Sequence, residues 1–203
     1  MRFSLFVAAA VLLAITPGPG IFYVLARSLA GGRREGVLSS LGTFVGGFVH
    51  VVAAALGISA ILVASAVAFS AVKYAGAAYL VYLGLRMIRS RHEEPESEPA
   101  PANNNAFSQG IVTEVLNPKT ALFFLSFIPQ FIVPSQGRVF AQFLLLGAVS
   151  VALNTSADLF VAFFAGPFGR RLKERVRFRS RQRTASGLAM IGLGAWVAVG
   201  DRR

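Results

Sequence analysis

The chain of 203 residues is 55% hydrophobic and 14% charged, and its mean hydropathy is +0.62. Because soluble domains carry about 25% charged residues, this composition excludes an ordinary soluble protein and predicts an integral membrane protein. The net charge of +11 does not indicate a nucleic-acid partner, since the basic residues lie between apolar stretches, where they orient a chain in the membrane.

The first predicted helix covers residues 3–25. A cleaved signal peptide is the alternative, because Arg2 precedes a short apolar run, but that run continues to the length of a membrane span. We therefore expect a retained helix that is interrupted near its centre, because proline removes a backbone donor and clashes with the preceding turn. The interrupting residues are Pro17, Gly18, Pro19 and Gly20.

Five further apolar stretches predict five more helices. They cover residues 37–63, 67–82, 111–133, 139–168 and 185–199. A span needs roughly 20 residues, so the chain has room for about six spans and for no soluble domain. The sequence lacks the alternation of a transmembrane barrel.

The distribution of basic residues predicts the orientation in the membrane. Fourteen of them lie at 27–34, 86–91 and 170–183, between predicted helices, whereas five lie on the opposite side. The positive-inside rule makes those three connections cytoplasmic, so six spans place both termini outside. Arg2 leaves open a five-span arrangement in which the first helix is inverted.

Residues 93–105 (EEPESEPAPANNN) are acidic, rich in proline and poor in apolar side chains, which predicts a disordered cytoplasmic linker. The linker separates residues 1–92 from residues 106–203, each half with three predicted spans. Because three is odd, the second half enters the membrane from the opposite side. The predicted fold is therefore all-α, with six transmembrane helices in two inverted three-helix repeats that form one membrane domain.

A second break, Asn117-Pro118-Lys119, interrupts the apolar stretch 107–131, and Pro118 lies at a depth comparable to that of Pro17. Helices broken at corresponding positions of two halves typically face each other near the bilayer midplane and bind the cargo. We therefore expect helices 1 and 4 to be broken at a central site. The alternative is a pair of ordinary proline kinks, which membrane helices tolerate.

Several fragments occur in a specific order along nearly the whole chain. They are the first break, the glycines Gly31, Gly36, Gly42 and Gly46, the run KYAGAAYLVYLG at 73–84, FSQG at 107–110, Asn117-Pro118-Lys119 and FIPQF at 127–131. In this order they resemble the LysE/RhtB family of amino-acid exporters. The resemblance implies export of amino acids or related small metabolites, such as homoserine, threonine, lysine or their derivatives, across a bacterial inner membrane. It also implies an ion gradient as the driving force, and we expect H⁺ as the coupling ion.

Polar residues at the breaks are the candidate substrate-binding residues. After Gly20 a new half-helix can begin, and its free amides favour a carboxylate. Asn117 and Pro118 have the residue types of an N-cap and a first helical position. Lys119 near mid-depth costs about 2.5–3.5 kcal/mol, so we expect it to pair with a substrate carboxylate, with snorkelling toward a water-filled vestibule as the alternative.

Three further side chains lie within predicted spans. His50 can relay a proton or contact the substrate, and an interhelical hydrogen bond is the alternative. Asp158, with Asn154 one turn earlier, is the candidate for the substrate ammonium or the coupling proton, and a structural pair with Lys119 or a backbone amide is the alternative. Glu114 precedes the second break by one turn, a position that also fits the cytoplasmic interface.

Two other functions are alternatives to amino-acid export. A membrane-embedded enzyme lacks its residues here: there is no serine-protease motif, no second intramembrane histidine and no His-Glu zinc spacing. An exporter of a metal or other inorganic ion stays open, although a chain without cysteine and with two histidines disfavours soft metals. We expect no cofactor and no resident metal, with the amino acid, membrane lipid and H⁺ as partners. The sequence does not decide the cargo or whether the chain forms a homo-oligomer.

Overall fold

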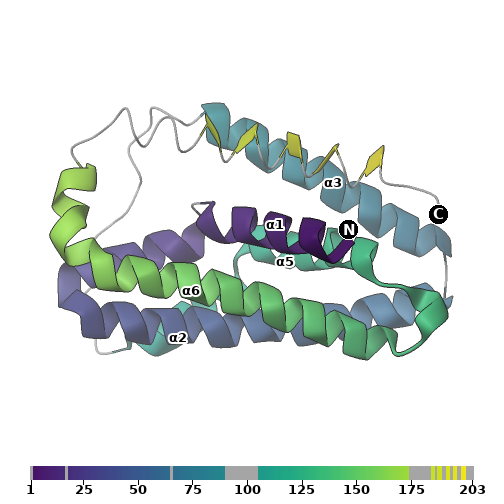
Figure 1. Ribbon diagram of the computed structural model, residues 1–203, viewed down its shortest axis with the longest axis horizontal. Coiled ribbons are helices and arrows are strands. Elements are labelled where there is room, and N and C mark those ends of the chain that lie inside the picture. Colours follow the sequence, from purple (N-terminus) through teal and green to yellow (C-terminus); the bar gives the residue numbers. More distant parts are fainter. Residues whose placement is uncertain are drawn as a thin grey trace.

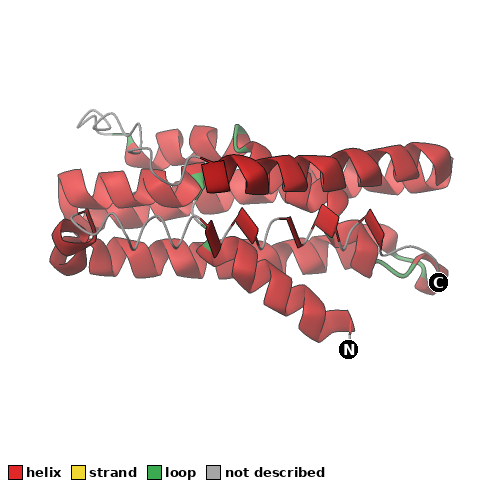
Figure 2. Cartoon of the chain, turned by 90° about the horizontal axis from the view of Figure 1, so that it is seen from above, coloured by secondary structure: helices red, strands yellow, loops and turns green. Residues whose placement is uncertain are grey.

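The computed structural model describes residues 2–16, 18–64, 66–89 and 105–173 and ten positions between 184 and 199. Within these ranges the regular structure is helical throughout, which confirms the all-helical class, and Figure 2 shows the helices as a layered bundle. The helices are α1 (Arg2–Ile15), α2 (Pro19–Ala64), α3 (Ala66–Arg89), α4 (Ala106–Val115), α5 (Pro118–Ser126) and α6 (Val139–Lys173) (Figure 1). Two 3₁₀ turns, η2 (Ile128–Phe131) and η3 (Pro134–Gln136), connect α5 to α6.

The first predicted helix is interrupted where the sequence indicated. α1 ends at Ile15, and α2 begins at Pro19. The Thr16 backbone amide still donates to the carbonyls of Leu12 and Leu13, both at 3.1 Å, and its hydroxyl donates to Leu12 at 2.6 Å. These bonds close the last turn of α1 before the chain departs from helical geometry.

Helix α2 is a hairpin with two arms, residues 19–31 and 33–64. Gly32 alone separates them, with φ of 77°, a left-handed conformation that glycine adopts without steric cost. In a straight helix, residues eight apart lie about 12 Å apart along the axis. Here Arg27 pairs with Glu35 at 3.6 Å, and Gly36 packs directly on Ser28. Figure 1 shows the chain reversing direction at this end of the molecule.

The second arm of α2 packs closely against α4. Gly42 lies directly against the Phe107 carbonyl, and a side chain at Gly110 would begin 2.7 Å from the Ser39 carbonyl. Without a side chain at either position, the two backbones can touch, as small residues allow between membrane helices. On the other side, this arm packs on α6, where Gly47 faces Val151.

The second predicted break is a bend between α4 and α5. The axes of Ala106–Val115 and Pro118–Phe131 differ by 49°. Asn117 is the N-cap of α5, with its side chain accepting from the Lys119 amide at 3.1 Å, and Pro118 follows in the first turn. This confirms the N-cap prediction, because proline suits a position whose N–H would be unpaired.

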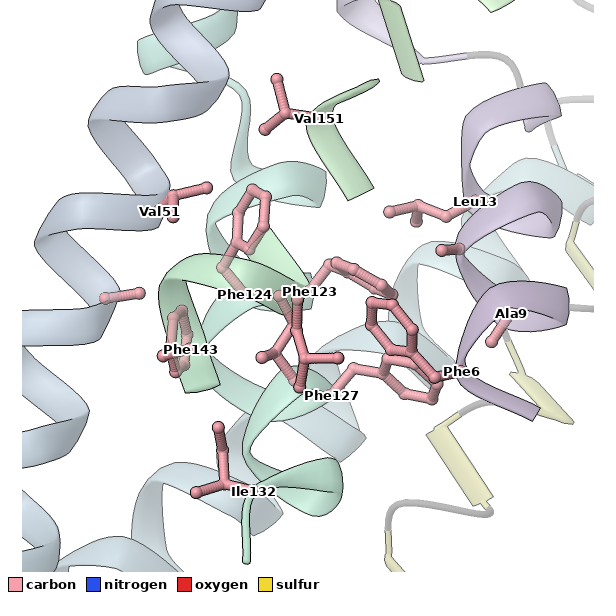
Figure 3. Packing of buried hydrophobic residues seen from close by; sticks show 14 of the residues in the cluster. Phe6, Ala9, Leu13, Val51, Phe123, Phe124, Phe127, Ile132, Phe143 and Val151 are labelled. Atoms are coloured by element: carbon pink, nitrogen blue, oxygen red, sulfur yellow. The ribbon is translucent and has the colours of Figure 1, made fainter. Parts of the chain in front are cut away.

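Aromatic side chains of α5 form the centre of the apolar core (Figure 3). The rings of Phe123 and Phe127 stack at 4.9 Å, and Phe127 meets Phe131 at the same distance. Phe6 of α1 contacts Phe131 edge-on at 5.3 Å. In lipid the hydrophobic effect does not drive such contacts, so close van der Waals packing holds α1 on η2.

By length and composition, two of the described helical segments, Pro19–Gly57 and Val139–Phe164, suffice to cross a membrane, and the bent pair of α4 and α5 adds a third. The first of these segments contains the reversal at Gly32. The six-span inverted repeat and its boundaries stay a prediction. Of the predicted linker 93–105, residues 93–104 lie outside the described residues, as do residues 174–183 of the basic run 170–183. Near the C-terminus, Gly187 and Gly194 pack on α3 at Gly84 and Ala77.

Candidate substrate site at the two helix breaks

Lys119 joins the second break to the first. Its side chain is 8% exposed, and its Nζ donates to the carbonyls of Thr16 at 2.8 Å and Leu13 at 3.1 Å. These carbonyls lie at the C-terminal end of α1, where a cation is favoured by unpaired carbonyls and by the helix dipole. Gly18 leaves the space for this side chain, since a methyl group there would begin 3.2 Å from Nζ. The two breaks are therefore in direct contact.

Glu114 lies between the same two breaks and is 1% exposed. Its Oε1 accepts from the Thr120 hydroxyl at 2.7 Å, and its Oε2 accepts from the Asn117 side-chain amide at 3.1 Å. A side chain at Gly20 would begin 2.6 Å from Oε2, so this carboxylate occupies the position beside the first turn of α2. Glu114 is thus buried between the two breaks, and its depth relative to the cytoplasmic interface stays a prediction. The signal that could have identified it was an acid within one turn of a break inside an apolar stretch.

His50, on the second arm of α2, contacts the backbone of α4. Its Nε2 lies 2.8 Å from the Glu114 carbonyl oxygen, and because a carbonyl only accepts, Nε2 carries the proton. The imidazole stacks on Phe124 at 6.4 Å. This is an interhelical hydrogen bond, one of the two alternatives from the sequence.

Asp158 of α6 is 1% exposed and reaches the same region through Thr43. Its Oδ2 lies 2.8 Å from the Thr43 hydroxyl, which is also 3.0 Å from the Ser40 carbonyl. The Thr43 methyl group is 3.8 Å from the point where a side chain at Gly20 would begin. Asp158 therefore borders the first break, and its hydrogen-bond partner is a hydroxyl on α2.

A second polar cluster lies at the hairpin of α2. Arg27 is buried, and it bonds to the Tyr23 hydroxyl at 3.2 Å and to the Gln109 side chain at 3.1 Å, in addition to Glu35. The Tyr23 hydroxyl donates to the Ala106 carbonyl at 2.8 Å. This cluster fastens the start of α4 to the hairpin, apart from the breaks.

The structure brings most of the predicted site residues together. Gly18, Gly20, His50, Asn117, Pro118, Lys119 and Asp158 belong to the two breaks or lie next to them. Pro19 is exposed, Asn154 is partly buried on α6, and Pro17 lies outside the described residues. Glu114, Thr120 and Thr43 were not among the predicted site residues. We call Glu114, Lys119, Asp158 and their hydrogen-bond partners the break layer.

The break layer holds two acids and one base, away from water. An unpaired charge at such a depth is costly, and intramembrane ionisable groups usually serve binding or ion pathways. The layer also offers a cation-binding helix end at Leu13 and Thr16. These features suit a small ligand that carries both a positive and a negative charge.

Residues 11–200 match the family model described as LysE type translocator. The chain belongs to this family. The translocator is 35% identical over 200 residues to an uncharacterised membrane protein of Pseudomonas aeruginosa, covering 95% of this chain and 89% of the relative. It is 30% identical over 202 residues to a leucine efflux protein of Enterobacter sp. (strain 638), covering 98% and 95%.

A homoserine/homoserine lactone efflux protein of Salmonella typhimurium is 30% identical over 169 residues, which cover 77% of the translocator and 80% of that relative. No solved structure matches the chain significantly. The resemblance to the exporter family inferred from the sequence fragments is therefore confirmed.

Proposed function

We propose that this translocator exports amino acids or closely related metabolites across the bacterial inner membrane in exchange for H⁺. A leucine efflux protein is similar to this chain over nearly its whole length. A homoserine/homoserine lactone efflux protein is similar to it over most of its length. The observation that carries the proposal is the contact between the two breaks, where the buried Lys119 bonds to the end of α1 and the buried Glu114 lies beside the first turn of α2. A zwitterion can replace these internal partners without leaving a charge unpaired.

In the proposed binding mode, the substrate carboxylate is held by Lys119 and by amides near Gly20. Lys119 then exchanges its bonds to the α1 carbonyls for bonds to the carboxylate. The ammonium or the coupling proton is taken by Asp158, with His50 in support at the α4 backbone. Both charges of the substrate thereby find protein partners in a medium where water does not solvate them.

Export then requires the two halves to rock about the break layer, opening it first to the cytoplasm and then to the exterior. Gly32 and the bend at Asn117 are positions where the backbone departs from helical geometry and can turn with little distortion. The basic segment 170–183 would face the cytoplasm and anionic lipid, and both termini would be external.

The test is transport by the purified translocator in liposomes loaded with one amino acid at a time. We expect efflux of at least one aliphatic or hydroxylated amino acid, accelerated by an inward proton gradient and weakened when an ionophore collapses that gradient. Liposomes without protein, measured in parallel, give the leak. Efflux equal to this leak for every amino acid would overturn the proposal, and stimulation by a sodium gradient alone would overturn the choice of H⁺.

A further inference from the structure

The two acids of the break layer have different hydrogen-bond surroundings. Both oxygens of Glu114 receive a donor, from Thr120 at 2.7 Å and from Asn117 at 3.1 Å. Asp158 has the Thr43 hydroxyl at 2.8 Å. The number of donors around each carboxyl group therefore differs between the two acids, and this difference suggests different roles for them.

Glu114 is surrounded as a carboxylate. The Asn117 amide can only donate through its nitrogen, because its oxygen already accepts from the Lys119 amide as the N-cap of α5. Rotating the Asn117 amide group would break that cap, so a donor is fixed on Glu114 Oε2. Both oxygens of Glu114 therefore act as acceptors, which is the hydrogen-bond arrangement of a carboxylate.

Asp158 has fewer donors than Glu114. The Thr43 hydroxyl has one hydrogen and lies within bonding distance of both Asp158 Oδ2 and the Ser40 carbonyl, so two acceptors share this hydrogen. When Thr43 donates to Ser40, its oxygen can accept a hydrogen bond from the protonated form of Asp158. A neutral Asp158 also leaves one negative and one positive charge in the break layer, on Glu114 and Lys119, and no third charge is buried.

We propose that the two acids divide the work of the transport cycle: Glu114 binds the ammonium group of the substrate, and Asp158 carries the coupling proton. This assignment rests on the proposed function and names which acid does which task. The ammonium joins Glu114 in the place beside Gly20, and Asp158 alternates between the neutral acid, bonded to Thr43, and the carboxylate, its proton passing to water on one side of the membrane and returning from the other.

Electrostatics couples the two events. The charged groups that act on Asp158 are Glu114 of α4 and Lys119 of α5, and His50 of α2 adjoins the Glu114 backbone. The negative charge of Glu114 opposes a second negative charge on Asp158, and the positive charge of Lys119 favours one. A bound zwitterion places its ammonium on Glu114 and its carboxylate on Lys119, so it cancels both effects. Because the effect of Glu114 on Asp158 is the larger of the two, substrate binding promotes loss of the Asp158 proton. The consequence is exchange of substrate for proton.

The assignment is tested with Glu114→Gln, Asp158→Asn and the matched control Glu35→Gln in liposomes. Glu35 pairs with Arg27 at the hairpin, outside the break layer. Two activities are measured with ¹⁴C-leucine and ¹⁴C-homoserine: counterflow against unlabelled substrate without a pH gradient, and net transport driven by a pH gradient. A pH-indicator dye records proton release when substrate is added to the detergent-purified protein.

We expect Asp158→Asn to retain counterflow but to need a higher substrate concentration for it, since the amide resembles the neutral acid, which opposes substrate binding. The variant should lose the response to the pH gradient and the proton release. Glu114→Gln should lower counterflow at least about 30-fold, because it removes the carboxylate that pairs with the buried ammonium group of the substrate. Glu35→Gln should behave as the parent. With the parent protein, N-acetyl-leucine, which lacks an ammonium group, should fail to compete with ¹⁴C-leucine in counterflow. This measurement tests the role of Glu114 even if Glu114→Gln does not fold.

Counterflow retained by a monodisperse Glu114→Gln variant, or competition by N-acetyl-leucine, would overturn the role of Glu114. Proton release retained by Asp158→Asn, or loss of its counterflow together with the proton response, would overturn the division of roles. If the parent protein shows no counterflow with any amino acid, the proposed function itself has failed, which is a distinguishable result.

Discussion

Replacing Gly20 by alanine tests whether Glu114 occupies the position beside the first turn of α2. Helix propensity alone predicts that alanine stabilises a helical position by up to about 1 kcal/mol. The new methyl group, however, would lie 2.6 Å from Glu114 Oε2, which is closer than the atoms can approach. The carboxylate must therefore move away from Thr120 and Asn117.

The magnitude follows from those two bonds. A hydrogen bond to a charged group contributes about 1.5–3 kcal/mol. Losing one of the bonds at 2.7 and 3.1 Å outweighs the gain in propensity, so we expect Gly20→Ala to destabilise the protein by about 1–2 kcal/mol. For a chain of this size, that lowers the melting temperature by roughly 2–8 °C.

The assay is thermal denaturation of the detergent-purified protein, followed by the loss of the monodisperse peak in size-exclusion chromatography. Gly57→Ala is the control, because a side chain at this helical glycine meets nothing within 4 Å. We expect the control to be as stable as the parent or slightly more stable. A Gly20→Ala protein that matches or exceeds the control would refute the position assigned to Glu114.

Three other outcomes are expected. Lys119→Met should insert normally but fail to export, since it removes the cation proposed to hold the substrate carboxylate. Export at the parental rate by this variant would mean that the charge of Lys119 has only a structural role. Asn117→Ala should lower stability by about 0.5–2 kcal/mol through loss of the N-cap, whereas Asn117→Asp, which keeps a capping oxygen, should retain the cap; equal melting temperatures of parent and Asn117→Ala would contradict this. A cysteine at Ser180 should resist an impermeant thiol reagent in intact cells, and labelling there would overturn the predicted topology.

The positions of both breaks were predictable because the physics is local. Proline lacks a backbone donor and clashes with the preceding turn wherever it stands in a helix, so the interruption before Pro19 and the N-cap at Asn117 could be read from the residues themselves. The apolar composition likewise predicted helices, since lipid demands that backbone groups bond within the segment.

Tertiary packing decided the features that the sequence did not show. A single glycine, Gly32, suffices for the hairpin of α2 because Gly36 admits the close approach of Ser28. The partner of Lys119 is the end of a helix more than 100 residues earlier, and no spacing rule connects the two. Glu114 was ambiguous because its neighbours depend on how closely α4 packs on α2, and Gly42 and Gly110 allow the two backbones to touch.

Substrate protection of a single cysteine tests the central claim, which is that amino acids bind where the two breaks meet. The native chain has no cysteine, so one introduced cysteine can be alkylated selectively. Thr16 is buried beside Lys119, so a cysteine there reacts only when the break layer opens during transport, and a cysteine at the exposed Ser135 serves as the reference. We predict that a transported amino acid slows alkylation at position 16 and leaves the rate at position 135 unchanged. Equal rates at position 16 with and without saturating substrate, in a variant that still transports, would contradict the account.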